Sequence, residues 1–211
     1  MTLESQTAEF VERHSRAVTL TDGTTIEVRP IAPGDRSLLL EGLERLSQES
    51  RWFRFHRPVS RLTDRELRYL TEIDYLDHFA WVAVTADDPR TGIGVARYVR
   101  ATGEPEVAEA AIVVADEWQG RGVGTILLEL LALSASQHGI RVFRAFVAEA
   151  NHRTRQMLAR VGSPGSSVDG VSTYELEVPG VGSPIRDTPL YELLIGAASG
   201  DLELEPPPIS I

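Results

Sequence analysis

The sequence predicts a mixed α/β fold, in which helices cover a twisted sheet. Three observations carry this prediction. Apolar runs with strand character recur through the middle of the chain, at 79–85, 93–100 and 107–115. The last of these runs meets a glycine-rich turn. That turn opens directly into a long helix, whose broad apolar face needs a sheet to pack on.

The N-terminal part of the chain predicts a short hairpin. Residues 1–18 are polar and irregular, with weak helical character over residues 8–13. Residues 19–29 have strand character on both sides of Asp22-Gly23, a pair that favours the tight turn of a β-hairpin. We therefore expect a folded domain from residue 19, preceded by an N-terminal extension over 1–18.

Three helices are expected between this hairpin and the first long strand. One begins at Pro33-Gly34-Asp35, and its apolar positions recur at helical spacing, at Leu38, Leu39, Leu43 and Leu46. A short second helix is expected over residues 51–55. The third should run over residues 64–73, because Thr63 and Glu66 have the spacing of a capping box.

The C-terminal half predicts further alternation of helices and strands. The helix after the glycine-rich turn presents Ile126, Leu127, Leu130, Leu131 and Leu133, and it ends at His138-Gly139. A strand over 142–148, a helix over 151–161 and a hairpin around Asp169-Gly170 should follow. The composition changes at Pro179. The tail over 179–211 is expected to hold one short helix after Thr188-Pro189 and a disordered, proline-rich end.

The composition indicates a globular domain. Of its 211 residues, 42% are hydrophobic and 25% are charged, which is normal for a folded protein. The net charge of −10 argues against binding to nucleic acid and favours basic partners. Cysteine is absent and the five histidines are scattered, so we expect neither disulfides nor a metal site. No apolar run approaches the ~20 residues of a membrane span and no signal peptide is visible, so a cytoplasmic protein without membrane contact is expected.

The segment from Val113 to Thr125 predicts a phosphate-binding turn. Its three glycines, at positions 120, 122 and 124, stand between a strand and a helix. Backbone N–H groups and the positive end of the helix dipole then point at one place, which suits a phosphate. The third glycine comes one residue early for the dinucleotide signature, and no Gly-Lys-Ser/Thr ending follows for a Walker-type loop. A glycine-rich turn without a ligand is the alternative.

Residues 119–124 resemble, in their spacing, the Q/R-x-x-G-x-G/A signature of the GNAT superfamily of acyl-CoA-dependent N-acyltransferases. The order of elements over 107–162 is similar to the coenzyme-binding core of that family. Residues 28–66 resemble the catalytic domains of bacterial Pat-type protein lysine acetyltransferases. The resemblance implies a GNAT domain over 19–178 with a mostly antiparallel sheet, splayed at the coenzyme site, and helices on both faces. It also implies acetyl-CoA as the co-substrate.

The resemblance assigns residues to this coenzyme. The backbone of Ile112, Val113 and Val114 would hydrogen-bond the pantetheine arm. The turn around the pyrophosphate would comprise Gln119, Gly120, Arg121, Gly122, Val123, Gly124 and Thr125. Arg121 would add charge toward a phosphate, or it is an exposed loop arginine. Asn151 would contact the pantetheine, cap the helix that follows it, or do both.

Glu109 is the candidate general base. A free lysine has a pKa of about 10.4, so a base must remove a proton before its amine attacks a thioester. Glu109 stands ten positions before Gln119, where the lysine-acetylating branches of the family place their glutamate. It lies among alanines in an apolar strand, so burial should raise its pKa. The alternative is an edge-strand charge that points into water.

Two further positions bear on the reaction. The resemblance implies that the backbone N–H of Val114, freed by a bulge, stabilises the oxyanion. The family's tyrosine general acid, seven positions after the asparagine, is replaced by Leu158. Three functions therefore remain open: a protein lysine acetyltransferase, a small-molecule amine acetyltransferase, and an acyl-CoA sensor without turnover.

The acceptor side has more ambiguous candidates. The aromatic group Trp52, Phe53, Phe55 and His56 lies where family members form the acceptor site, but such residues also build cores. The cluster Asp74, Tyr75 and His78 either meets a substrate or ends a helix. Acidic residues Glu49, Asp64 and Asp74 would suit a cationic acceptor, whether a protein lysine or a small amine. A monomer and a homodimer are both compatible with the sequence.

Overall fold

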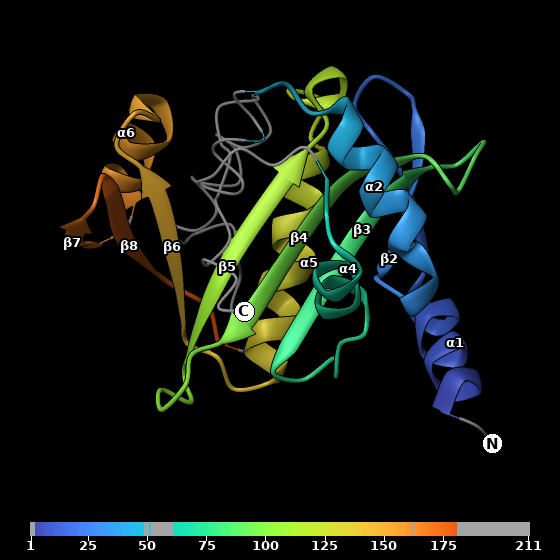
Figure 1. The fold of residues 1–211 in the computed structure, drawn as a ribbon, viewed down its shortest axis with the longest axis horizontal. Coiled ribbons are helices and arrows are strands. Elements are labelled where there is room, and N and C mark those ends of the chain that lie inside the picture. The colour runs from blue at the N-terminus through green and yellow to red at the C-terminus, as the bar shows by residue number, and fades with distance from the viewer. Residues whose placement is uncertain (1–2, 49–50, 52–60, 162, 181–211) are drawn as a thin grey trace.

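The computed structural model describes residues 3–48, 51, 61–161 and 163–180 of the chain. The described strands form one sheet in the order β1-β2-β3-β4-β5-β6-β8-β7 (Figure 1). They are β1 (Arg16–Thr19), β2 (Thr25–Pro30), β3 (His78–Thr85), β4 (Gly92–Arg100), β5 (Val107–Val114), β6 (Val142–Ala148), β7 (Ser163–Val168) and β8 (Val171–Glu177). Neighbouring strands are antiparallel except β5 and β6, which run parallel. The predicted mixed, mostly antiparallel sheet is confirmed.

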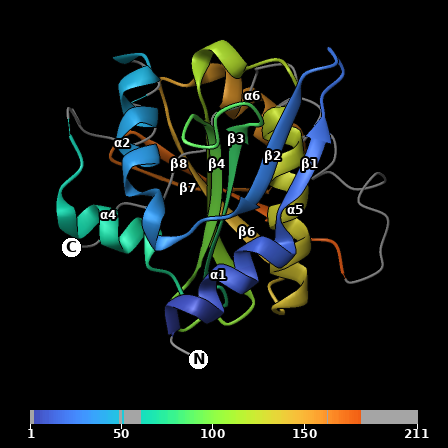
Figure 2. The same cartoon turned by 90° about the vertical axis from the view of Figure 1, so that its right-hand side faces the viewer.

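Helices cover both faces of the sheet, with α2 and α4 on one side and α5 on the other (Figure 2). The described helices are α1 (Leu3–His14), α2 (Arg36–Arg45), α4 (Asp64–Thr71), α5 (Val123–Gln137) and α6 (His152–Val161), with 3-10 turns at Pro33–Asp35 and Asp116–Trp118. Helix α1 is longer than the weak local tendency predicts, because Phe10 packs against the main core. Of the helix expected over 51–55, the structure describes only residue 51, which is helical. The rest of that helix and the helix expected in the tail lie outside the described residues.

Two local sequence signals form the predicted structures. At the β1–β2 turn, Gly23 has φ +85° and the Asp22 carboxylate accepts a hydrogen bond of 2.9 Å from the Thr24 N–H. At the start of α4, the Thr63 hydroxyl accepts from the Glu66 N–H at 3.3 Å, while the Glu66 carboxylate accepts from the Thr63 N–H at 2.7 Å. The hairpin and the capping box are therefore confirmed.

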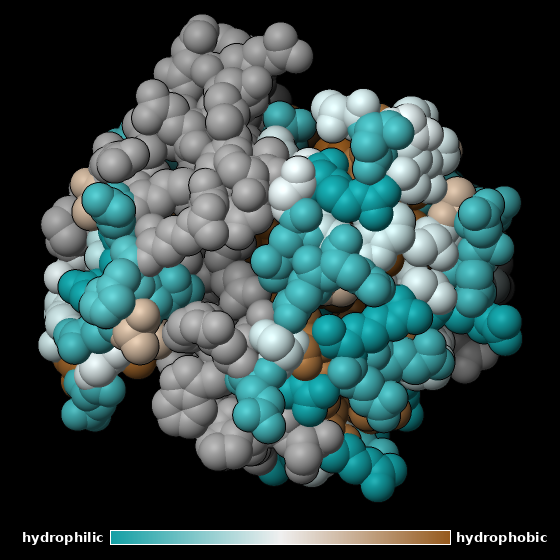
Figure 3. All heavy atoms as spheres, turned by 90° about the horizontal axis from the view of Figure 1, so that it is seen from above, coloured by the Kyte–Doolittle hydropathy of each residue, from teal (hydrophilic) through white to brown (hydrophobic). Residues whose placement is uncertain are grey.

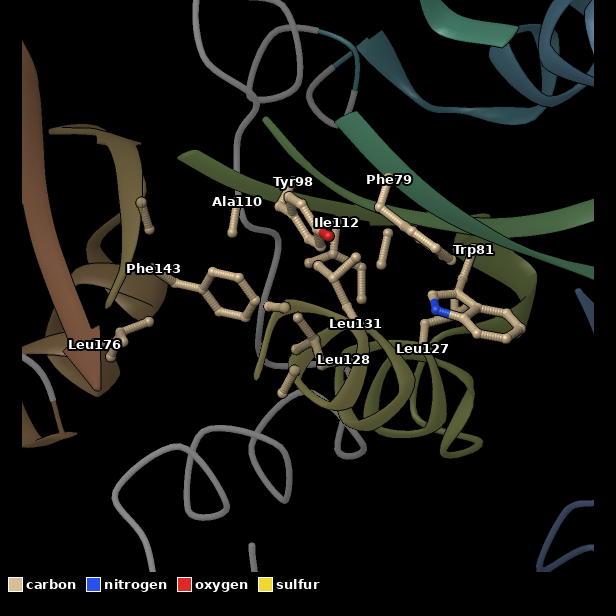
Figure 4. Close-up of a cluster of buried hydrophobic side chains, with 14 of the residues drawn as sticks. Phe79, Trp81, Tyr98, Ala110, Ile112, Leu127, Leu128, Leu131, Phe143 and Leu176 are labelled. Carbon is tan, nitrogen blue, oxygen red and sulfur yellow. The ribbon is translucent and has the colours of Figure 1, made fainter. Parts of the chain in front are cut away.

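The main core lies between α5 and the sheet (Figure 4). Leucines of α5 point at large aromatic side chains of β3 and β4, and Phe143 of β6 and Leu176 of β8 extend the cluster toward the other end of the sheet. The labelled members are Phe79, Trp81, Tyr98, Ala110, Ile112, Leu127, Leu128, Leu131, Phe143 and Leu176. Such a core is the main source of stability for a domain of this size.

The outer surface contrasts with this core. Seen from above, the described surface is mostly hydrophilic, and hydrophobic residues show only in small patches (Figure 3). Over the described residues, no helix combines the length and the apolar character that crossing a membrane would require.

Candidate active site

The sheet opens between β5 and β6. Their parallel pairing runs from Val107 opposite Val142 to Glu109 opposite Arg144. Beyond Glu109 the described parts of the two strands are not paired, and Figure 1 shows the strands diverging toward the glycine-rich turn. The predicted splay is therefore present, and it begins at Glu109.

The main-chain N–H and C=O groups of successive β5 residues alternate in direction. Those of one residue face β4, and those of the next face the opening between β5 and β6. The N–H of Ala115, just after β5, donates to the Ile93 carbonyl of β4 at 2.9 Å. Because main-chain groups alternate in direction along a strand, those of Val114 and Ile112 point away from β4. The side-chain amide of Gln119 agrees with this direction, since it donates to the Val114 carbonyl at 3.2 Å.

The structure changes two expectations about this segment. Val113 lies opposite Val95, so its main-chain groups face β4 and are not directed at a pantetheine arm. The N–H of Val114 is not freed by a bulge, because the register between β4 and β5 runs without a shift along β5. The divergence of β6 leaves this N–H on the open side instead.

The glycine-rich turn has the backbone that the sequence predicts. Gly120 has φ +71° and Gly122 has φ +90°, a region that side chains disfavour. Gly122 is the N-cap of α5, and no other atom lies within 4 Å of where its Cβ would stand. Val123, Gly124 and Thr125 form the first turn of α5, so the positive end of the helix dipole faces this open space.

Arg121 has a role that the sequence does not reveal. Its Nε donates to the Asp22 carboxylate at 2.8 Å, and its Nη2 donates to the Thr24 hydroxyl at 2.7 Å. Its guanidinium also lies 4.0 Å above the ring of Trp118. Hydrogen bonds from Thr24 and Arg121 lower the pKa of Asp22 to about 2, so the ion pair persists at neutral pH. Arg121 thus ties the glycine-rich turn to the β1–β2 hairpin.

Glu109 is half-buried on an internal strand, which excludes the exposed edge charge. Its neighbours Ala108 and Ala110 belong to the core on the α5 side, so its own side chain lies on the face covered by α2 and α4. Burial raises the pKa of Glu109, the positive charge of Arg144 lowers it, and Glu104 raises it. The net shift is upward, as the sequence predicts.

Arg144 links two carboxylates at the start of the splay and lies near a third, that of Glu109. It donates to both oxygens of Glu104, at 2.8 and 3.0 Å, and to Glu175 at 2.8 Å. It also lies opposite Glu109 in the β5–β6 register. Sequence reasoning missed this network, because its members come from distant segments. A single arginine inside the apolar strand over 142–148 was the available signal.

A buried cation lies on the same face as Glu109. Arg97 of β4 is 3% exposed, and both its Nη atoms donate to the Leu70 carbonyl at 3.3 Å. Its Nη1 also lies 3.0 Å from Nε2 of His78. Burial, followed by the charge of Arg97, lowers the pKa of His78 to about 3, so this imidazole is neutral at pH 7. Nε2 of His78 is therefore the acceptor of the Arg97 hydrogen bond.

A small cavity of about 60 Å³ lies between α2, α4 and strands β4 and β5. Its walls are mainly aliphatic, and residues from each side include Leu38, Gly42, Leu43, Leu70, Arg97 and Val113. Val113 therefore contributes its side chain, rather than its backbone, to a pocket.

Several other sequence candidates have structural roles. One carboxylate oxygen of Asp74 accepts three backbone N–H groups at 2.9 Å and so shapes the turn before β3. The Tyr75 hydroxyl donates to the Ile31 carbonyl at 2.7 Å. Asn151 is buried directly before α6, and its carbonyl accepts from the Arg155 N–H. Leu158 is fully buried in the main core.

Some candidates cannot be placed. Glu49 and the aromatic group Trp52, Phe53, Phe55 and His56 lie outside the described residues. Within the described residues, no group of three or more His, Asp or Glu side chains is arranged to hold a metal ion.

Comparison with known proteins gives consistent matches. The model of the acetyltransferase (GNAT) family matches residues 45–162. Acetyltransferase Pat of Mycolicibacterium smegmatis is 37% identical over 174 residues, which cover 82% of this chain and 50% of that protein. Acetyltransferase PA5475 of Pseudomonas aeruginosa is 30% identical over 147 residues, covering 69% of this chain and 78% of that protein. The solved GNAT domain of S. lividans PAT has 33% identity and a TM-score of 0.69, covering 77% of this chain and 96% of that domain. The chain thus spans about half the length of the mycobacterial relative.

Proposed function

Because the chain belongs to the GNAT family of acetyltransferases, we propose that it transfers an acetyl group from acetyl-CoA to a primary amine, with Glu109 as the general base. One observation carries the proposal. Glu109 is half-buried at the last position where β5 and β6 pair. Beyond it the strands separate, and the main-chain groups of Ile112 and Val114 face the opening.

In the proposed complex, acetyl-CoA lies in the splay between β5 and β6. Its pyrophosphate is held by main-chain N–H groups over residues 120–125, at the N-terminus of α5. The left-handed conformations of Gly120 and Gly122 support this placement, and the space beside Gly122 is open at the positive end of the helix. The pantetheine arm pairs with main-chain groups of Ile112 and Val114, and Asn151 contacts it from the start of α6.

The reaction is a direct transfer. The neutral amine attacks the thioester carbonyl, a nitrogen–carbon bond forms, and Glu109 takes the amine proton directly or through water. The N–H of Val114 donates to the developing oxyanion. The carbon–sulfur bond then breaks and the thiolate leaves. Leu158 is buried and aliphatic, so the position of the family's tyrosine supplies no proton, and the thiolate leaves unprotonated or takes a proton from water or another residue.

The proposed acceptor is a lysine side chain of a protein. Two observations support this class. The chain is 37% identical to a protein named Acetyltransferase Pat, and its net charge of −10 favours approach of a cationic surface. A small-molecule amine is the second candidate acceptor, because the same charge favours a free amine as well.

Replacing Glu109 tests the base. In E109Q the turnover number for a lysine peptide should fall by about 10²–10⁴-fold, the range typical of a lost general base. Acetyl-CoA should still raise the melting temperature, because the side chain of Glu109 makes none of the proposed coenzyme contacts. E106Q is the matched control, since Glu106 is exposed in the turn before β5 and carries the same change of charge. Equal turnover in E109Q and E106Q at every pH would remove Glu109 from the reaction.

Labelling identifies the acceptor class. A lysate incubated with the protein and isotope-labelled acetyl-CoA should yield newly labelled lysines by mass spectrometry, and E109Q should not produce them. If polyamines or other small amines were labelled and lysines were not, the acceptor would be a small-molecule amine and the proposed protein lysine would be wrong. Coenzyme binding without any labelled product would instead indicate an acyl-CoA sensor.

A further inference from the structure

Arg97 is a buried cation without a carboxylate partner among the described residues. It is 3% exposed, and its described hydrogen bonds go to a backbone carbonyl and to a neutral imidazole. Burial lowers the pKa of Arg97 to about 10, although Tyr69 raises it, so the guanidinium stays charged at pH 7. A buried charge is costly unless an opposite charge pairs with it. The site therefore favours an anion, which the described residues do not supply.

The hydrogen bonds of Arg97 use only part of its guanidinium. Both Nη atoms donate to the Leu70 carbonyl, and Nη1 also donates to His78. Among the described residues, the buried Nε–H has no hydrogen-bond acceptor. A guanidinium has five N–H donors, and its Nε–Nη2 edge matches the two oxygens of a carboxylate. Nη2 carries two N–H groups and only one donates to Leu70, so among the described contacts the Nε–H and the second Nη2–H remain for a carboxylate.

Arg97 also lines the cavity between α2, α4 and the sheet. The cavity volume is about 60 Å³, and a water needs roughly 10–15 Å³ of such space, so a few waters or one short aliphatic chain would fit. Its aliphatic walls disfavour a phosphate, which requires many hydrogen-bond donors. No other cationic side chain of the described residues lines this cavity.

The cavity lies beside the proposed reaction centre. Arg97 is opposite Ala111 in the β4–β5 register, between the positions of Glu109 and Val113. These side chains share the face covered by α2 and α4. Ala111 and Val113 are two residues apart, or about 7 Å along the strand. The position of Arg97 is thus only two residues along the facing strand from the positions of Glu109 and Val113.

We propose that this cavity binds a short aliphatic carboxylate, with the carboxylate paired to Arg97 and the carbon chain against the leucines of α2. The carboxylate has two possible sources. It is either a free short-chain acid or the terminal carboxylate of a dicarboxylic acyl group carried by coenzyme A. The second source rests on the proposed function, whereas the first does not.

The first experiment uses free ligands. Calorimetric titration of the whole chain should give tighter binding of butyrate than of its neutral isostere butyramide. In R97M the butyrate affinity should fall about 10–100-fold, as for the loss of a charged hydrogen-bond pair. R97K keeps the charge but not the paired edge, so it should recover only part of the affinity.

A second variant tests the same cavity without changing Arg97, and so remains informative if R97M does not fold. Gly42 lies on α2 and lines the cavity, and apart from its own helix backbone and its chain neighbours nothing lies within 4 Å of where its Cβ would stand. G42L should fill the cavity and abolish butyrate binding without touching Arg97. G42A, which adds one methyl group at the same helical position, should keep it. Equal butyrate binding in all three chains with Arg97 intact would overturn the proposed site.

The second experiment separates the two sources. Succinyl-CoA and butyryl-CoA have chains of equal length and differ in the terminal carboxylate. Tighter binding of succinyl-CoA, lost in R97M while acetyl-CoA binding persists, would assign the carboxylate to the acyl group. Butyrate binding without a preference for succinyl-CoA would assign it to a free acid. If neither butyrate nor succinyl-CoA is preferred over its neutral counterpart, the proposal is wrong. Failure of acetyl-CoA itself to bind would count against the proposed function and leave the butyrate result standing.

Discussion

The two halves of β5, residues 107–109 and 110–114, have similar sequences but differ in how their main-chain groups are paired. Residues 107–109 pair with β6, and Ala108 and Glu109 also pair with β4, so the main-chain groups of this half form hydrogen bonds within the sheet. Residues 110–114 still pair with β4 but are not paired with β6. Both halves are rich in alanine and valine. The neighbouring strand, rather than the composition of β5, thus decides which main-chain groups hold the fold and which are available to a ligand.

Single proline substitutions at two adjacent positions, 113 and 114, should give the largest difference between main-chain groups that hold the sheet and main-chain groups that face the opening. V113P removes an N–H that faces β4, so the free energy of unfolding should fall by about 2 kcal/mol or more. V114P removes an N–H on the open side, where a proline is tolerated. It should keep the fold but lower the turnover number about 10²–10³-fold, as for a lost oxyanion donor.

Urea unfolding and steady-state acetyl transfer measure these two effects. V114A keeps the main-chain N–H and is the control for loss of the valine side chain. The comparison would fail if V114P unfolded as readily as V113P, or if it turned over at the normal rate.

The open half of β5 leads into Gly122, and a side chain there should abolish coenzyme binding. G122V forces a valine into φ +90°, which costs about 1–2 kcal/mol, and places its methyl groups in the open space before α5. Acetyl-CoA should no longer raise the melting temperature of this variant.

Gly139 provides a matched control for strain. It has φ +77° and open space around its Cβ position, but it lies beyond the other end of α5. G139V should lose comparable stability and keep the acetyl-CoA shift. If both variants lose the shift equally, the turn at Gly122 is not a specific coenzyme site.

A smaller effect, on the pH dependence of acetyl transfer, is expected from a change of charge near Glu109, where the two halves of β5 meet. Arg144 lowers the pKa of Glu109, against the larger upward effect of burial. A general base works only when deprotonated, so acetyl transfer should decline as the pH falls through the pKa of Glu109. In R144Q this decline should begin at higher pH, because a positive charge near the carboxylate has been removed.

The pH profile of kcat/KM measures this change. R141Q is the control, since Arg141 is exposed just before β6 and carries the same change of charge. An acidic limb that moves to lower pH in R144Q, or moves equally in R141Q, would contradict the proposed electrostatics.

The parts of the fold that were predictable depend on contacts close in sequence. The turn at Asp22-Gly23, the capping box of Thr63 and Glu66, and the glycine-rich turn each need only a few neighbouring residues. The direction of the Glu109 pKa shift was predictable for a similar reason, because its strand neighbours are small and apolar.

The parts that were missed depend on contacts between distant segments. Arg97 reaches Leu70 and His78, and Arg144 joins Glu104 to Glu175. Sheet order and register decide these contacts. A lone arginine in an apolar strand, such as Arg144, indicates that a partner is needed but does not identify it. The main-chain direction of Val114 was missed for the same reason, since it depends on the pairing of Ala115 with Ile93.

The tether between Arg121 and Asp22 has a consequence for how the chain folds. Its two residues are 99 positions apart, so the contact can form only after a large loop of chain has closed. Contacts of such long range slow folding and form once most of the sheet is assembled. In a refolding experiment, recovery of acetyl-CoA binding should therefore lag behind recovery of helical circular dichroism. Under the proposed function, the coenzyme turn would then serve as a late reporter of correct folding.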